Sequence, residues 1–84
     1  MDEPESALSP ARQLALLSLI KNRVQEGGSQ FLIATHSPIL MTYPGAEILS
    51  FDGGGLAPVS LEETDHYQIT RGVLEHPARY WKHL

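Results

Sequence analysis

A short, uninterrupted apolar run, Phe31-Leu32-Ile33-Ala34, constrains the fold more than any other feature of this sequence. A strand that is apolar at every position is typical of a parallel sheet, where other elements cover both of its faces. Such a strand needs neighbouring strands, and the rest of the 84-residue chain has few strand signals. The pattern therefore predicts an α/β fold, and the short inventory of strands predicts a partial domain.

Composition excludes several classes of protein. With 42% hydrophobic residues the chain is too apolar for wholesale disorder, and its net charge of -4 argues against direct binding of nucleic acid. The absence of cysteine excludes a disulfide framework and a thiolate metal site. The longest apolar stretch, residues 14–20, is far shorter than the ~20 residues of a membrane span. We therefore expect a cytoplasmic protein with no membrane partner.

The strongest local signal predicts a helix over residues 10–25. Ser9 followed by Pro10 is typical of an N-cap and the first helical position, and Gly27-Gly28 is a typical stop. Apolar residues recur at three- and four-residue spacing along this segment: Leu14, Leu17, Ile20 and Val24. This stripe predicts a well-buried amphipathic helix.

Further local signals predict the remaining elements. Ser37-Pro38 repeats the capping pattern and predicts a short helix through about residue 41. Residues 47–52 and 56–59 read as two strands of a hairpin, joined by a glycine-rich turn at Asp52-Gly53-Gly54-Gly55. A helix begins after Thr64 or Asp65 and is interrupted at His76-Pro77, and a last short helix covers residues 77–83. The expected order is helix, strand, short helix, hairpin and helix.

Two motifs lie about one helix apart. Asp2-Glu3-Pro4-Glu5 precedes a turn of small residues and the helix at 10–25, and the apolar run that follows ends at Thr35-His36-Ser37. Together they resemble the C-terminal half of the nucleotide-binding domain of ABC-type P-loop ATPases, and in particular the soluble predicted ATPases labelled AAA. The resemblance covers residues 2–60 and leaves 61–84 as a C-terminal helical segment. On this view the fold is a partial P-loop NTPase domain, and residues 1–84 form a single partial domain.

The resemblance implies a role for each matching residue. Asp2 corresponds to the Walker B aspartate, which holds Mg²⁺ through a water molecule. Glu3 corresponds to the catalytic carboxylate that orients or deprotonates the attacking water, and His36 to the switch histidine that contacts the γ-phosphate of ATP. The residues at the D-loop position, which would face a second subunit in a head-to-tail homodimer, are Ser6, Ala7, Leu8 and Ser9.

The sequence also departs from the family pattern. Ser9 stands where an aspartate is usual, which puts a carboxylate contact across the dimer in doubt. The chain contains no Gly-x-x-x-x-Gly-Lys-Ser/Thr phosphate loop and no Leu-Ser-Gly-Gly-Gln signature, and Gly55 is followed by Leu56 rather than by Lys. We therefore expect a C-terminal fragment, arising from a truncated gene, a misplaced start codon or deliberate design. ATP and Mg²⁺ would bind only together with an N-terminal half, so this chain alone is expected to bind neither and to be inactive.

Other interpretations remain open. The chain could be a small non-catalytic module that binds a protein through an unpaired strand edge or through Tyr80-Trp81, or an ATPase remnant. The carboxylates near the N-terminus could be no more than a solvated acidic end. A metal site at His66, His76 and His83 is not expected, because Pro77 interrupts the helix between them and no carboxylate or thiol completes the set.

Overall fold

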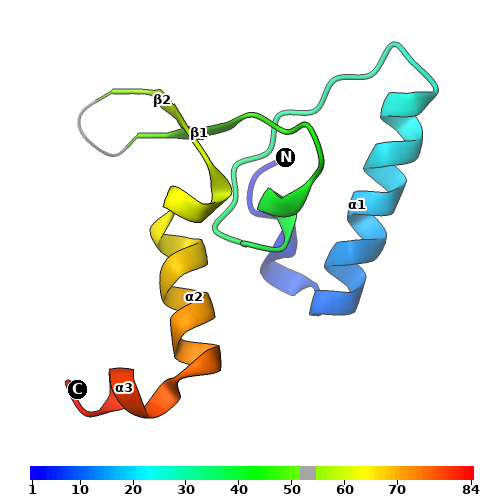
Figure 1. The fold of residues 1–84 in the computed structure, drawn as a ribbon. Helices are drawn as coiled ribbons and strands as arrows, with labels where there is room; N and C mark the ends of the chain where they lie inside the picture. The colour runs from blue at the N-terminus through cyan, green and yellow to red at the C-terminus, as the bar shows by residue number, and fades with distance from the viewer. Residues whose placement is uncertain (52–54) are drawn as a thin grey trace. The chain divides into compact units, whose positions relative to one another are not determined.

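The computed structural model describes residues 1–51 and 55–84, and its internal contacts divide the chain into two compact units (Figure 1). The first unit, Met1–Pro44, contains a 3-10 turn at Pro4–Ala7, helix α1 at Pro10–Gln25 and a second 3-10 turn at Leu40–Thr42. The second unit, Gly45–Leu84, contains strands β1 (Ile48–Ser50) and β2 (Ala57–Val59), a 3-10 turn at Leu61–Glu63, and helices α2 (Asp65–Glu75) and α3 (Pro77–Trp81). Helices and a small sheet agree with the coarse prediction of an α/β fragment. The extent of the predicted single domain, residues 1–84, stays a prediction.

Helix α1 has the bounds that its sequence predicts. Ser9 adopts an extended conformation, and its hydroxyl accepts a hydrogen bond from the backbone N–H of Arg12 at 3.3 Å, with Pro10 at the first helical position. After the helix, Gly27 and Gly28 have positive φ angles of 87° and 75°. Residues with a Cβ rarely adopt that conformation, so this pair ends the helix.

The prediction that α1 is well buried is wrong for this structure. Only Gln13 and Ile20 of the helix are buried, whereas Leu14 is 59% and Leu19 is 56% exposed. The periodic stripe identifies the face that prefers an apolar neighbour, but periodicity cannot supply that neighbour. Within the first unit, the 3-10 turn at Leu40–Thr42 contacts α1, and Leu40 is its one buried residue.

The predicted doubly covered strand at residues 31–34 is also wrong. The segment makes only an isolated parallel bridge, between Ala34 and Asp2, and Leu32 is 85% exposed. The bridge is nevertheless supported by three hydrogen bonds. The Met1 amino group donates to the Leu32 carbonyl at 2.7 Å, the Ala34 N–H to the Met1 carbonyl at 2.8 Å, and the Glu3 N–H to the Ala34 carbonyl at 2.6 Å. A segment with one short neighbour pairs locally without becoming a regular strand.

The short helix expected after Ser37-Pro38 is present as a single 3-10 turn and lies further along the chain than predicted. It covers Leu40–Thr42, and the Leu40 N–H donates to the Ser37 hydroxyl at 3.3 Å. The residue directly before the turn is Ile39, so the Ser37 hydroxyl contacts the turn from two positions earlier than its cap. Tyr43 and Pro44 follow too closely for a longer helix. Gly45, with φ of 81°, completes the exit.

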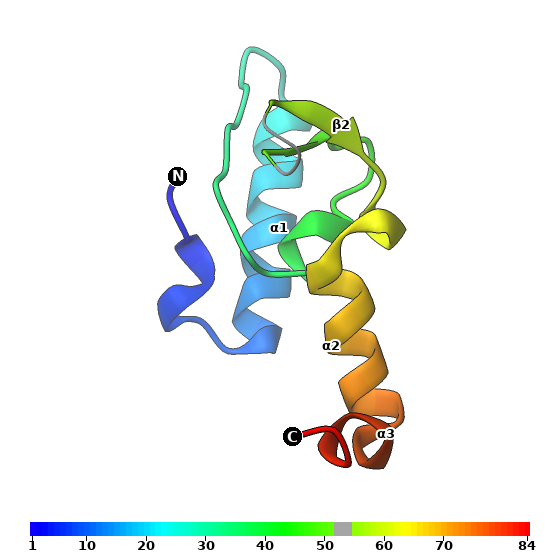
Figure 2. The ribbon, with the colours of Figure 1, turned by 90° about the vertical axis from the view of Figure 1, so that its left-hand side faces the viewer.

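The second unit follows the local signals closely. β1 and β2 form the predicted antiparallel hairpin, with Ile48 opposite Val59 and Ser50 opposite Ala57. The predicted glycine turn at residues 52–55 lies outside the described residues except for Gly55. The Thr64 hydroxyl accepts from the Tyr67 N–H at 3.1 Å and caps α2, which ends at Glu75 (Figure 2). His76 is then non-helical and α3 begins at Pro77, as expected for the residue before a proline.

The Ser9 cap gives a first testable prediction. Replacing Ser9 by alanine removes the acceptor for the Arg12 N–H and is expected to lower the free energy of unfolding by about 1 kcal/mol. Ser9→Asp keeps a capping oxygen, so it should retain or slightly increase stability. Chemical denaturation followed by circular dichroism measures both variants, and equal losses in the two would contradict the capping role.

Candidate functional site

The parallel bridge between the chain's start and Ala34 brings the two predicted motifs together. Asp2 pairs with Ala34, and the two segments run parallel. Glu3 and His36 therefore both follow the paired residues, at the same end of the bridge. Glu3 has a left-handed backbone, with φ 47° and ψ 55°. That conformation costs a residue with a Cβ about 1–2 kcal/mol. Strained residues of this kind concentrate at functional sites, where the surrounding contacts hold them.

The side chains of Glu3 and His36 lie close together although the two residues are 33 positions apart in the sequence. The His36 Nε2 atom lies 3.6 Å from Glu3 Oε1, and the two side chains are 70% and 53% exposed. This distance allows an ion pair when the imidazole is protonated. A carboxylate and an imidazole exposed side by side can both reach a bound ligand. The catalytic roles predicted for the two residues stay predictions.

Glu5 also belongs to the site, although the sequence analysis did not predict it as a site residue. Its Oε1 accepts a hydrogen bond from the Thr35 hydroxyl at 2.7 Å, and its Oε2 accepts one from the His36 backbone N–H at 3.1 Å. Partial burial acts to raise the pKa of Glu5, but the hydrogen bonds from Thr35 and from backbone N–H groups, with His36 nearby, outweigh it and lower the pKa. The stabilisation from this contact is complete above the ordinary carboxyl pKa of about 4.3 and is lost as the pH falls through the lowered value.

A second polar contact holds the segment after His36. Gln13 of α1 and Ser37 are the two buried polar residues among those the structure describes, and the Ser37 hydroxyl donates to Gln13 Oε1 at 2.5 Å. The Gln13 side-chain amide in turn donates to the Leu8 carbonyl at 3.3 Å. Gln13 therefore connects the turn before α1 with the segment that carries His36. The sequence signal that could have identified Gln13 is a polar residue within the apolar stripe of the helix, although that signal does not specify the residue's partner.

Most of the other predicted site residues are exposed. Ser6 and Ala7 are exposed in the 3-10 turn, Leu8 is partly buried, and Ser9 is the exposed cap of α1. Asp2 is exposed, and within the described residues its carboxylate makes no hydrogen bond or ion pair.

A single carboxylate can be sufficient for magnesium. The part of the chain that the structure describes has no group of three or more His, Cys, Asp and Glu residues placed to hold a metal ion. Mg²⁺, however, usually takes one or two carboxylates and completes its shell with water and substrate phosphates. The exposed Asp2 fits that chemistry, whereas a site made wholly of protein ligands is not present in the described residues.

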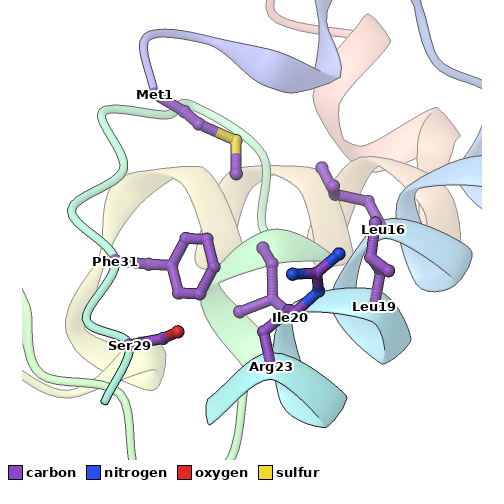
Figure 3. Close-up of a pocket in the computed structure, with 7 residues that line it drawn as sticks. All are labelled: Met1, Leu16, Leu19, Ile20, Arg23, Ser29 and Phe31. Atoms are coloured by element: carbon purple, nitrogen blue, oxygen red, sulfur yellow. The ribbon is translucent and has the colours of Figure 1, made fainter.

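An apolar pocket of about 300 Å³ lies on the other side of the bridge, between α1 and the ends of the two paired segments. Met1 and Phe31 face the helix across it, and Arg23 of α1 is one of the lining residues (Figure 3). The other lining residues are Leu16, Leu19, Ile20 and Ser29. The pocket is separate from the Glu3–His36 contact and contains one charged side chain, so it is an apolar packing surface rather than a part of the candidate site.

One known family matches the N-terminal half of the chain. A family model described as "AAA domain, putative AbiEii toxin, Type IV TA system" matches residues 1–42. These residues include the bridge, α1 and the Glu3–His36 contact. Separate comparisons with curated proteins and with solved structures found no match. No helix in the described residues is long and apolar enough to cross a membrane. Because the match covers half of the chain, this protein belongs to that family of AAA domains.

Proposed function

We propose that residues 1–42 supply the hydrolytic side of an ATP site in an AAA-type ATPase of the ABC type. One observation carries the proposal: the bridge between Asp2 and Ala34 places the carboxylate of Glu3 3.6 Å from the imidazole of His36. Family membership supports ATP as the nucleotide. Acid–base chemistry on a bound water requires a carboxylate beside a group that can contact the γ-phosphate, and this pair provides both.

Each side chain has a defined task in this proposal. Glu3 accepts a hydrogen bond from the attacking water and holds it in line with the γ-phosphate. His36 donates a hydrogen bond from its imidazole to a γ-phosphate oxygen and loses that contact when the phosphate leaves. Because Glu3 and His36 are in contact, loss of the phosphate at one of them alters the electrostatic surroundings of the other.

Asp2 is the residue that would hold magnesium. Mg²⁺, when bound, neutralises the charge that builds up on the phosphate oxygens. The exposed Asp2 carboxylate can accept hydrogen bonds from the ion's water ligands and needs no rearrangement of other described side chains to do so.

The segment Ser6, Ala7, Leu8 and Ser9 is proposed to face a second subunit. Three of these four residues are exposed, and the 3-10 turn at Pro4–Ala7, which contains Ser6 and Ala7, begins directly after Glu3. A head-to-tail homodimer would then place partner groups close to the carboxylate. Ser9 carries no charge, so its contribution to such a contact would be a hydroxyl hydrogen bond.

Residues 1–84 alone are expected not to hydrolyse ATP. The sequence contains no loop with backbone N–H groups and a lysine arranged to bind the phosphates, and catalysis of phosphoryl transfer depends on that positioning. Release of phosphate from Mg-ATP measures the activity. Turnover by the 84-residue chain that disappears in Glu3→Gln would contradict this expectation.

The test of the proposed function joins residues 1–84 to an upstream segment of the same family that carries a phosphate loop. Mg-dependent ATP hydrolysis is expected in the joined protein, and neither part alone should show it. A matched control is the same protein with the phosphate-loop lysine replaced by alanine, which should be inactive. Nucleotide binding without any hydrolysis in the joined protein would contradict the roles proposed for this chain's residues.

A further inference from the structure

Thr35, His36 and Ser37 form a short segment that polar contacts hold on both sides. On one side the Glu5 carboxylate accepts from the Thr35 hydroxyl and the His36 N–H, at 2.7 and 3.1 Å. On the other side the Ser37 hydroxyl donates to Gln13, and both of these residues are buried. The segment is not part of a regular helix or strand beyond the bridge at Ala34. These contacts therefore replace the backbone ladder that would otherwise fix its conformation.

We propose that Glu5 is a positioning residue, which acts through Thr35 to present His36 to Glu3. The Thr35 hydroxyl donates to Glu5 and accepts a hydrogen bond from the Ser37 N–H at 3.0 Å, so it connects the carboxylate to both sides of His36. The imidazole then extends from a backbone that is held at residues 35, 36 and 37. Charged hydrogen bonds are the stronger kind, and a partly buried carboxylate with two donors makes a firm anchor.

The different exposure and contacts of the two carboxylates explain why Glu5, and not Glu3, holds the His36 backbone. Glu3 is exposed and makes its contact with the His36 ring, whereas Glu5 is partly buried and makes its contacts with the His36 backbone. The two carboxylates therefore divide two tasks within one motif of four residues. This inference rests on the proposed function, because the position of His36 affects catalysis only if that histidine contacts a phosphate. The arrangement itself can be measured without nucleotide.

The experiment is nuclear magnetic resonance of the ¹⁵N-labelled 84-residue chain and four variants. Thr35→Val removes the hydroxyl and keeps the shape, Thr35→Ser keeps the hydroxyl, and Glu5→Gln leaves one of the two donors without an acceptor. Thr70→Val is the matched control, since Thr70 is exposed in α2. The readouts are the nuclear Overhauser contact between the His36 ring and the Glu3 side chain, and the exchange rate of the His36 and Ser37 amides.

We expect Thr35→Val and Glu5→Gln to lose the His36–Glu3 contact and to exchange these two amides roughly tenfold faster or more. Thr35→Ser and Thr70→Val should behave like the wild-type chain, and the α1 amides should keep their shifts in all four. If Thr35→Val fails to fold, Glu5→Gln gives the answer with the same readouts.

A His36–Glu3 contact that persists in Glu5→Gln would overturn the positioning role, and so would equal damage from Thr35→Ser and Thr35→Val. Absence of the contact in the wild-type chain would overturn it as well. These outcomes are independent of ATP hydrolysis. Failure of the proposed function would instead appear as intact geometry in the 84-residue chain combined with no activity in the joined protein.

Discussion

Replacing Glu3 by glutamine in the joined protein, in which residues 1–84 follow a phosphate-loop segment, is expected to lower kcat by a factor of about 10²–10⁴. That range is typical for the loss of a general acid–base group. Glutamine has nearly the same shape as glutamate, so the contact with His36 loses its charge while the position of the side chain is retained. The variant should bind Mg-ATP as tightly as the wild type and retain it for longer.

The control for this prediction is Glu26→Gln. Glu26 is an exposed carboxylate at the C-terminal end of α1, outside the Glu3–His36 contact. Steady-state hydrolysis gives kcat and KM, and a filter assay gives the affinity for nucleotide. A Glu3→Gln protein with wild-type kcat would remove Glu3 from the mechanism, whereas a matching fall in Glu26→Gln would point to a general loss of charge or folding.

Replacing Gln13 by alanine is expected to destabilise the first unit by about 1–3 kcal/mol, the cost of leaving a buried polar group without its partner. The Ser37 hydroxyl donates to Gln13, and the residue Ser37 is only 7% exposed, so water cannot readily replace the lost acceptor. The Leu8 carbonyl loses its donor in the same variant. For a domain this small, such a change is a large part of the total stability.

Gln25→Ala is the matched control, because Gln25 lies on the same helix and is exposed. Its effect should remain within about 0.5 kcal/mol. Hydrogen exchange of the α1 amides measures the two variants residue by residue and reports on the first unit alone. Equal effects of Gln13→Ala and Gln25→Ala would show that the Gln13–Ser37 contact contributes nothing to stability.

Some residues of the candidate site could be predicted from the sequence and others could not, for a physical reason. The resemblance implies that Asp2, Glu3 and His36 act at one nucleotide site, but no local pattern in the sequence places their side chains in contact. In the structure the bridge at Ala34 brings the two motifs together, with Glu3 beside His36. Glu5 and Gln13 were not predicted as site residues. Their partners lie 24 to 31 positions away in the sequence, and no local pattern specifies hydrogen bonds over that separation.

The sequence by itself determined the elements whose signals are local. Ser9 with Pro10 and the glycine pair set the bounds of α1, Thr64 set the start of α2, and His76-Pro77 separated α2 from α3. Hydrogen bonds over three or four residues decide such boundaries, so the residues involved are read directly from the chain. The tertiary structure alone decided burial and pairing. An apolar run such as residues 31–34 favours a strand that is buried on both faces. Whether that strand forms depends on the neighbouring segments with which it can pair.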